Sequence, residues 1–216
     1  NLEQEKRMSL ISMIPINTEE RNFSMLMNIY QKALEQVYND FENMKQTVNE
    51  FYGYDVINNI TKRIKTPSSI VNKMKKKKYE LNYKELIENI NDVAGVRIIC
   101  PVKSNIYTVV DMIQKMTNIK VVHIKDYINK PKESGYSGYH IIVETPVEVQ
   151  GKKVPVKVEI QIRTMAMDFW ATNEHKIKYK TNKKLSFIDS KKLTIYAKLL
   201  NFLDDRTEKI YEKSNG

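Results

Sequence analysis

Polar and aliphatic side chains alternate strictly over residues 154–163. This period of two predicts a strand with Val and Ile on one face and four polar residues on the other: Lys157, Glu159, Gln161 and Arg163. A sheet that buries its apolar face in a core can hold charged groups rigidly on the opposite face. We therefore expect this polar row, which contains Glu159, to form half of an active site.

A second carboxylate, Asp92, stands just before the apolar strand expected over residues 95–101. On its own, an Asp in this position more often makes a local hydrogen bond to the backbone. Together with Glu159 it could hold one Mg²⁺ ion, which typically takes one or two carboxylates plus phosphate oxygens and water. The pair therefore predicts Mg²⁺ as the cofactor.

Cations and hydroxyl groups gather between Arg63 and Lys73. Arg63 and Lys65 share one strand face, and Ser69 and Lys73 lie one helical turn apart on the helix that starts after Pro67. A helix N-terminus adds backbone N–H donors and a favourable dipole. The set predicts a polyphosphate cradle, although no Gly-rich turn makes it a Walker A loop. A basic surface helix is the equal alternative.

The loop expected over residues 128–137 can present an aromatic ring, because glycines flank Tyr136 closely on both sides. Such a ring could stack on a nucleobase. The alternative is a tyrosine packed over a hairpin turn. A further candidate for base recognition is Asp168, in the helix after the polar strand. A carboxylate can accept two hydrogen bonds from the edge of guanine, a match that adenine does not offer.

The elements that must position these residues follow from hydrophobic periodicity. It predicts helices over residues 22–52, 68–74, 83–91, 105–116, 164–180 and 190–211, and strands over 56–65, 95–101, 120–127, 139–145 and 154–163. The expected fold class is α/β (α+β): a mixed, largely antiparallel sheet of about five strands flanked by helices. We interpret residues 1–216 as one domain with an N-terminal helical segment (1–55), a catalytic core (56–180) and a C-terminal helix (181–216).

Three local expectations concern the helices. Ser68 or Ser69 is expected to cap the helix that follows Pro67. One apolar stripe predicts the buried face of the helix over 164–180: Phe169, Trp170, Asn173 and Ile177. Another predicts the buried face of the last helix: Leu193, Tyr196, Leu199, Leu200, Leu203 and Ile210.

Composition narrows the classes of partner. The 216 residues carry 36 Lys and Arg against 26 Asp and Glu, a net charge of +10 that favours phosphate-bearing partners. The lysine run Lys75–Lys78 indicates a solvated helix end or, alternatively, a phosphate or RNA contact. The single Cys100 excludes a disulfide framework and a Cys-rich zinc site. No stretch resembles a signal peptide or a membrane span, so we expect a cytoplasmic protein.

Taken in order, these stretches resemble the (p)ppGpp synthetase domain of the RelA/SpoT homologue superfamily, and most closely the small alarmone synthetases. The resemblance covers about residues 63–180 and rests on four motifs: RxKxxxSIxxK, DxAGxR, KDYI…PK…GY…H and VEIQIRT…FWA…EHK…YK. It implies a nucleotidyltransferase-like synthetase fold. It also implies transfer of the β,γ-pyrophosphate of ATP to the 3′-OH of GDP or GTP, with release of AMP, in the stringent response.

The resemblance also implies a role for each motif residue. In ATP binding, two arginines would sandwich the adenine and the other residues would hold the phosphates: Arg63, Arg97, Lys65, Ser69 and Lys73. Asp92 and Glu159 would bind Mg²⁺, and Glu159 would also be the base for the 3′-OH. The acceptor nucleotide, which could also be GMP, would contact a third set: Lys125, Lys132, Tyr136, His140 and Asp168.

The chain departs from the family pattern at three positions near the acceptor motif. Gly138 stands where relatives often have Ser, and Ser137 and His123 stand where they often have a basic residue. A hydroxyl and a cation are thereby missing, which affects the expected acceptor preference. No hydrolase activity is expected. The family resemblance further implies a homotetramer, with the helices over 22–52 and 190–211 as candidate contacts.

Two other functions remain open from sequence. One is a regulatory module that binds single-stranded RNA on a synthetase fold, using its positive charge. The other is an ordinary nucleotidyltransferase, which shares the sheet and the Mg²⁺ site but would release pyrophosphate. Intact Asp92 and Glu159 favour an active synthetase.

Overall fold

The computed structural model describes residues 19–180 and 186–215. Its helices are α2 (Glu19–Tyr52), α3 (Pro67–Lys77), α4 (Tyr83–Asn89), α5 (Lys103–Lys115), α6 (Met165–Lys180) and α7 (Phe187–Asn215). Its strands are β1 (Asn59–Ile64), β2 (Ala94–Cys100), β3 (Lys120–Asp126), β4 (Tyr139–Val149) and β5 (Lys152–Thr164). Every element expected from the sequence is present, with ends shifted by a few residues.

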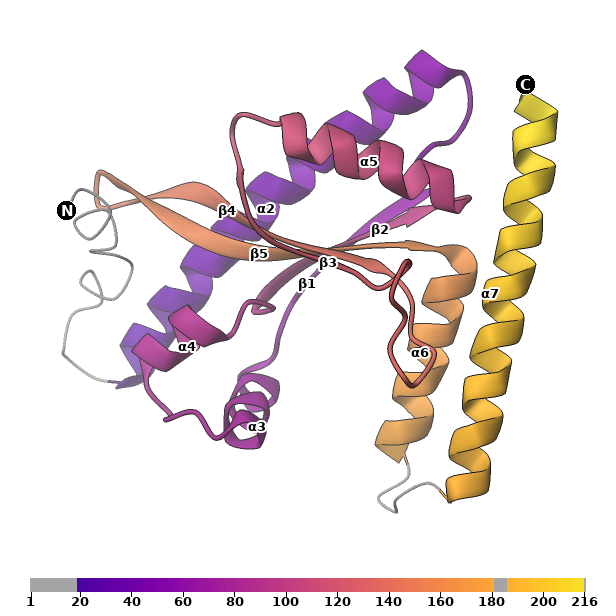
Figure 1. The fold of residues 1–216 in the computed structure, drawn as a ribbon. Helices are drawn as coiled ribbons and strands as arrows, with labels where there is room; N and C mark the ends of the chain where they lie inside the picture. Colours follow the sequence, from indigo (N-terminus) through magenta and orange to yellow (C-terminus); the bar gives the residue numbers. More distant parts are fainter. Residues whose placement is uncertain (1–18, 181–185, 216) are drawn as a thin grey trace.

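The five strands form one sheet in the order β1-β2-β5-β4-β3 (Figure 1). Only β2 and β5 pair in parallel, and the other three pairs are antiparallel. The predicted mixed, largely antiparallel sheet flanked by helices is therefore confirmed. The β4–β5 hairpin turns at Gln150 and Gly151, which both have positive φ, as the two-residue hairpin turns require.

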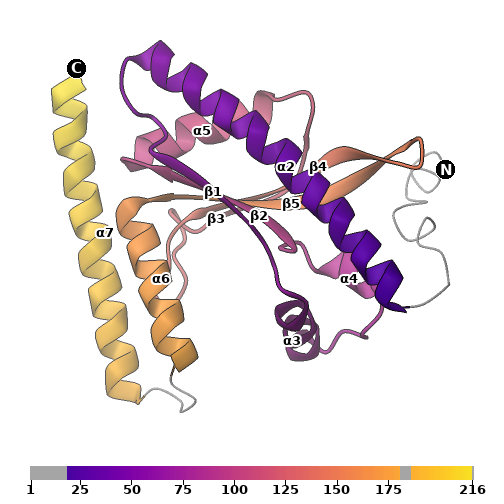
Figure 2. The same ribbon diagram turned by 180° about the vertical axis from the view of Figure 1, so that it is seen from behind.

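The hydrophobic core lies between the sheet and the helices α2 and α5. Figure 2 shows α2 crossing the strands. Its predicted inner face is buried throughout: Leu26, Ile29, Ala33, Val37, Phe41, Met44 and Val48. The aliphatic residues of β5 are buried in the same core, from Val154 to Ile162. The alternation of β5 therefore directs its polar row to the opposite face of the sheet.

Helices α6 and α7 lie side by side at the end of β5 (Figure 1). The stripe expected to bury α6 is partly wrong: Trp170 is buried, but its neighbour Phe169 is 61% exposed. Successive residues point about 100° apart around a helix axis, so a narrow interface cannot bury both.

The buried face predicted for α7 is also wrong for most of its members. Leu199, Leu203 and Ile210 are exposed, whereas Ala197 and Asp204 are buried. The helix docks through a small residue and through carboxylate hydrogen bonds, so its long apolar side chains point outward. Across residues 19–180 and 186–215, no helix is both long enough and apolar enough to cross a membrane.

Candidate active site

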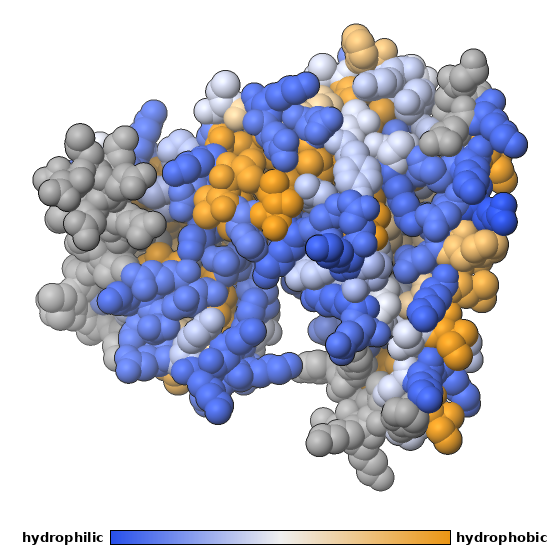
Figure 3. Space-filling view, in the orientation of Figure 1, coloured by the Kyte–Doolittle hydropathy of each residue, from blue (hydrophilic) through white to orange (hydrophobic). Residues whose placement is uncertain are grey.

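A cleft of about 580 Å³ opens on the polar face of the sheet. Figure 3 shows the molecule hollowed between the part that carries α3 and α4 and the part that carries α6, with hydrophilic residues on both borders. The cleft brings together six residues expected from the sequence: Lys73, Asp92, Lys125, Lys132, His140 and Glu159. His123 lines it too, so this departure from the family pattern faces the same space.

A smaller hollow of about 200 Å³ lies where β1, β2 and β5 meet. Arg63, Arg97 and Gln161 line it, together with Gly95. Gly95 pairs with Glu159 across the parallel strands and with Arg63 across the antiparallel ones. The two arginines expected to hold adenine therefore lie together, beside the strand that carries Glu159.

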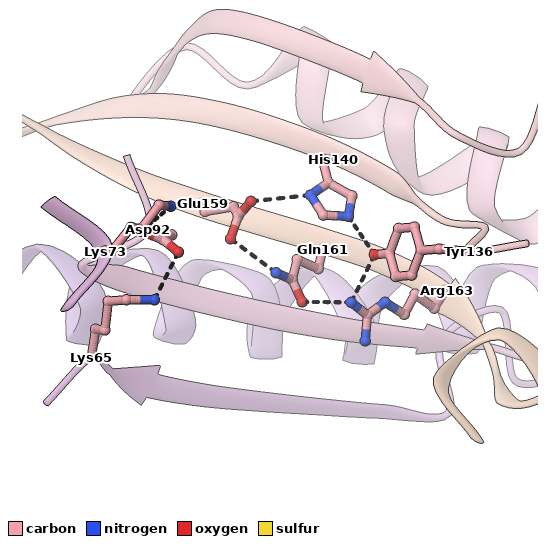
Figure 4. A network of polar contacts seen from close by, with 8 residues as sticks. All are labelled: Lys65, Lys73, Asp92, Tyr136, His140, Glu159, Gln161 and Arg163. Atoms are coloured by element: carbon pink, nitrogen blue, oxygen red, sulfur yellow. Dashed lines mark hydrogen bonds and ion pairs between the residues drawn. The ribbon is translucent and has the colours of Figure 1, made fainter. Parts of the chain in front are cut away.

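Asp92 is held by two lysines from different elements (Figure 4). Lys65 Nζ donates to Asp92 Oδ2 at 2.9 Å, and Lys73 Nζ lies 2.8 Å from Asp92 Oδ1. Burial by itself would raise the pKa of Asp92, but the contacts with Lys73 and Lys65 outweigh it and bring the pKa below its ordinary value. Asp92 is therefore ionised near neutral pH.

The turn that leads to Asp92 is tied to the polar row of β5. Lys157 Nζ donates to the backbone carbonyl of Glu88 at 2.9 Å, at the end of α4. Lys157 therefore stabilises the carboxyl end of α4. The segment that it holds runs directly into Asp92.

Both carboxylate oxygens of Glu159 accept a hydrogen bond. Glu159 Oε1 lies 3.0 Å from Nδ1 of His140, and Oε2 accepts from Nε2 of Gln161 at 2.9 Å. Burial would raise the pKa of Glu159, but the hydrogen bonds from His140 and Gln161 lower it further than burial raises it. The side chain is thus a nearly buried carboxylate with a fixed orientation.

These contacts belong to a closed ring of five side chains, drawn in Figure 4. From His140 the ring passes to the hydroxyl of Tyr136, which lies 2.5 Å from Nε2 of the imidazole. Nη2 of Arg163 donates to that hydroxyl at 2.8 Å and to Oε1 of Gln161 at 3.0 Å. Gln161 then returns the ring to Glu159. From the sequence, a supporting role and direct ligand contact suit Gln161 and Arg163 equally well. Their connection to Tyr136 and His140 is seen only in the structure.

Tyr136 is 9% exposed, and its ring lies among cations and other rings. Lys132 Nζ lies 4.9 Å from the ring centroid and the Arg163 guanidinium 5.2 Å from it. The rings of Tyr127 and His140 meet it edge to face. Burial raises the pKa of the Tyr136 hydroxyl, and the Arg163 charge opposes that rise. In this conformation the ring offers little surface for stacking on a base.

Asp168 lies between two guanidinium groups. Arg163 Nη1 donates to its Oδ1 at 3.0 Å, and Arg97 Nη1 lies 3.3 Å from the same oxygen. Burial and the charge of Arg163 lower the pKa of Arg97. The residue expected to read guanine is thus linked to a residue expected to hold adenine.

Gly138 lies against the same network. Its φ is +152°, a conformation that L side chains rarely adopt. A Cβ there would lie 3.3 Å from Cγ of Arg163 and 3.3 Å from the Tyr136 hydroxyl. The departure from Ser at this position therefore accompanies a backbone conformation that suits glycine.

Lys125 lines the cleft from β3, whereas Ser69 lies on α3, about one helical turn before Lys73. Lys125 pairs with His140 across β3 and β4, which places the two on neighbouring strands. Ser69 is in the first turn of α3, but Thr66 is the cap: its Oγ1 accepts from the backbone N–H of Ser69 at 3.3 Å. The expectation that Ser68 or Ser69 caps the helix is wrong, because Pro67 already occupies the first turn.

The carboxylates of the cleft are the candidate ligands for a metal ion. Within the described parts of the chain, no three His, Cys, Asp or Glu side chains are grouped so that they could hold one. Asp92 and Glu159, the two carboxylates expected from the sequence, both line this cleft. This set suits Mg²⁺, which commonly binds one or two protein carboxylates and completes its shell with phosphate oxygens and water.

Comparison with known proteins assigns the chain to a family. The model of the "region found in RelA / SpoT proteins" matches residues 62–184. The chain therefore belongs to the RelA/SpoT family. It is 38% identical to GTP pyrophosphokinase YwaC of Bacillus subtilis over 92% of this chain and 95% of the relative. It is 34% identical to GTP pyrophosphokinase YjbM of the same organism, over 75% of each chain.

Solved structures support the same assignment. Small alarmone synthetase 1 from Bacillus subtilis, bound to its product pppGpp, matches with a TM-score of 0.82 and 31% identity over 89% of this chain and 98% of that one. Small alarmone synthetase 2 from Bacillus subtilis matches with a TM-score of 0.80 and 37% identity, over 89% and 99%. The chain thus has the fold of the small alarmone synthetases, as the sequence motifs predicted.

Proposed function

We propose that this protein is a GTP pyrophosphokinase: it transfers the β,γ-diphosphate of ATP to the 3′-OH of GDP or GTP and releases AMP. The observation that carries the proposal is the cleft itself. Two ionised carboxylates, Asp92 and Glu159, lie in one space with the cations Lys73, Lys125 and Lys132. The match to pyrophosphokinases over almost the whole chain supports the same reaction.

In the proposed reaction the acceptor 3′-oxygen forms a bond to the β-phosphorus of ATP. The bond from that phosphorus to the α,β-bridging oxygen breaks, and AMP leaves with this oxygen. The 3′-OH proton passes to Glu159, whose carboxylate is ionised and oriented by His140 and Gln161. Catalysis then depends mainly on positioning and on neutralising charge.

Mg²⁺ fits the site as a second source of positive charge. When bound, it would neutralise phosphate oxygens and lower the charge repulsion between donor and acceptor. Asp92 and Glu159 would hold it. Lys65 and Lys73 pair with Asp92 in this structure, and both would also contact the ATP phosphates. The N-terminus of α3, with Ser69, would add backbone donors.

The remaining residues would divide between the two nucleotides. Arg63 and Arg97 would sandwich the adenine, from the smaller hollow. The acceptor nucleotide would contact four residues of β3, β4 and the loop between them: Lys125, Lys132, Tyr136 and His140. Asp168 would read the guanine edge after exchanging part of its contact with the two arginines. These roles remain predictions for binding experiments.

The reaction is tested by resolving the nucleotide products formed from ATP, GDP and Mg²⁺. AMP and a guanosine tetraphosphate in equal amounts are expected. Formation of ADP would indicate ordinary phosphoryl transfer, and release of pyrophosphate would indicate a nucleotidyltransferase; either result refutes the proposal. Comparing GMP, GDP and GTP in the same assay measures the acceptor preference.

We also propose a homotetramer and the division into residues 1–55, 56–180 and 181–216. The apolar side chains exposed on α7 support assembly, since apolar rows of this length commonly mark interfaces. Light scattering coupled to size-exclusion chromatography measures the mass directly.

An RNA-binding module without activity finds no support in the comparisons. Binding of single-stranded RNA through Lys75–Lys78 stays a prediction, tested by the salt dependence of affinity.

A further inference from the structure

The loop that carries Lys132 and Tyr136 is closed by a tight turn. The backbone N–H of Gly135 donates to the carbonyl of Lys132 at 2.8 Å, and the N–H of Lys132 donates to the carbonyl of Tyr136 at 3.0 Å. Gly135 has φ +82°, the left-handed conformation that favours glycine. The turn therefore fixes Lys132 above the ring of Tyr136, where the two side chains face each other.

This turn rests directly on the C-terminal helix. Figure 1 shows the β3–β4 loop running down alongside α6, the helix that packs on α7. A Cβ on Gly135 would lie only 2.3 Å from Cβ of Ala197, a residue of α7 that is 1% exposed. Real Cβ atoms essentially never approach so closely. The backbone of Gly135 thus packs on the methyl group of Ala197 with no room for another carbon atom.

Helix α7 is itself fixed to the sheet and to α5 by three acidic residues. Asp204 Oδ2 accepts from the hydroxyl of Thr164 at 2.8 Å, at the end of β5. Asp205 pairs with Lys103 Nζ at 2.5 Å. Glu208 accepts from the backbone N–H groups of residues 103 and 104, the first of α5.

These contacts lie about two to three helical turns from Ala197. The α5 cap position, Val102, offers no side-chain acceptor of its own, so Glu208 serves as the cap from another helix. The position of Ala197 is therefore set by bonds to the catalytic core.

We propose that Ala197 is a positioning residue for the acceptor nucleotide. It touches neither nucleotide. By packing on Gly135 it sets the height of the turn, and through the turn it sets Lys132 and Tyr136 relative to His140 and Glu159. The proposal rests on the proposed function for the identity of the ligand, a guanine nucleotide, and goes beyond it by making α7 part of the acceptor site. The ATP side is built on other elements, β1, α3 and β2, and should respond less.

The test adds a methyl group at Gly135 and, in a second variant, removes the methyl group of Ala197 on the other side of the contact. Gly135→Ala adds a Cβ that collides with Ala197 Cβ. Removing that methyl with Ala197→Gly leaves the nearest other atoms at 3.7 Å and 3.8 Å, an ordinary contact distance. We expect Gly135→Ala to raise the KM for the acceptor about tenfold, with the KM for ATP changed less than about twofold. A tenfold change corresponds to about 1.4 kcal/mol, a size typical of one extra methyl group forced into a tight contact.

The double variant Gly135→Ala with Ala197→Gly should recover at least about threefold of the lost acceptor affinity, a coupling that independent sites do not show. The strain of alanine at φ +82° persists in both variants, so recovery reports the contact alone. If the double variant binds acceptor no better than Gly135→Ala, or if the KM for ATP rises equally, Ala197 has no positioning role.

A second pair of variants avoids the strained backbone. Ala197→Leu should weaken acceptor binding in the same selective way, while Lys198→Leu places the same side chain on the exposed neighbouring position as a control. Thermal unfolding of each variant separates loss of fold from loss of affinity. Equal acceptor KM values for Ala197→Leu and Lys198→Leu, with both proteins folded, would overturn the proposal.

Titration calorimetry with GDP gives the same comparison without turnover. Should the wild-type protein bind GDP but form no AMP, the proposed reaction fails while the contact between Gly135 and Ala197 is still measured by binding. Should AMP form normally and the variants behave like wild type, the reaction stands and the inference fails.

Discussion

Replacing Arg163 by lysine should disconnect the ring that orients Glu159. The guanidinium donates to three side chains: to Tyr136 at 2.8 Å, to Gln161 at 3.0 Å and to Asp168 at 3.0 Å. It is also 5% exposed, so water does not replace a missing donor. A lysine keeps the charge but carries one nitrogen on a flexible stem, which cannot span the three acceptors.

The expected size of the effect follows from the hydrogen bonds that a lysine cannot make. Hydrogen bonds to charged groups contribute about 1.5–3 kcal/mol each, and a lysine would keep one of the three. If about half of this free energy reaches the transition state and the rest lowers the stability of the fold, kcat/KM falls about 10- to 100-fold. Most of the fall should lie in kcat, because the ring orients Glu159, the proposed base.

Steady-state AMP formation with saturating Mg²⁺ measures this prediction. Arg206→Lys is a matched control, since Arg206 is exposed on α7 and its guanidinium stacks on Phe202 with a 5.0 Å separation. That control should keep kcat/KM within about twofold, as surface substitutions do. A folded Arg163→Lys protein with wild-type kcat would show that the ring does not orient Glu159.

Three further outcomes are expected. Glu159→Gln should lower kcat by at least about a hundredfold with little change in thermal stability, since the amide keeps the shape but cannot take a proton; wild-type turnover would remove its role as base. Lys73→Met should raise the pKa of Asp92, so the acid limb of the kcat/KM profile moves to higher pH; an unmoved limb contradicts the link. Burial raises the pKa of Asp204 in the folded protein, so this carboxyl stabilises the fold when it is protonated. This contribution to stability is fully present below the pKa of the unfolded state. It is lost as the pH rises through the pKa of the folded state. Asp204→Asn, whose amide oxygen can still accept from Thr164, should therefore raise Tm at pH 7. It should also reduce the increase in Tm that the wild-type protein shows on acidification. A lower Tm of the variant at pH 7 would contradict this.

The sequence predicted the parts of the site that follow from local periodicity. Asp92 was singled out by the motif DxAGxR and by the carboxylate partner Glu159, whereas the polar row of β5 required only alternation. The elements and the buried face of α2 were found in the same way. Such features depend on residues close together in the chain.

Features that depend on packing between distant residues were not predicted. The link from Tyr136 to Arg163 needs the register of β4 on β5, which places residue 140 opposite residue 161. The predicted buried face of α7 was wrong because this helix packs through Ala197 and through hydrogen bonds from acidic side chains, and not mainly through its leucines. The predicted cap of α3 was wrong because Pro67 occupies the first turn, so the preceding residue, Thr66, caps the helix.

The single parallel pairing, β2 with β5, also determines when the site can form. Gly95 and Glu159 pair across these strands although a long stretch of chain, from 95 to 159, separates them. Closing so long a loop costs entropy before any contact repays it, so this pairing belongs to the slow, non-local steps of folding. A ribosome adds residues at about 5–20 per second, so a growing chain spends several seconds with Asp92 made and Glu159 absent. The carboxylate pair is therefore assembled late, and nascent or cleaved fragments that lack β5 carry no complete site.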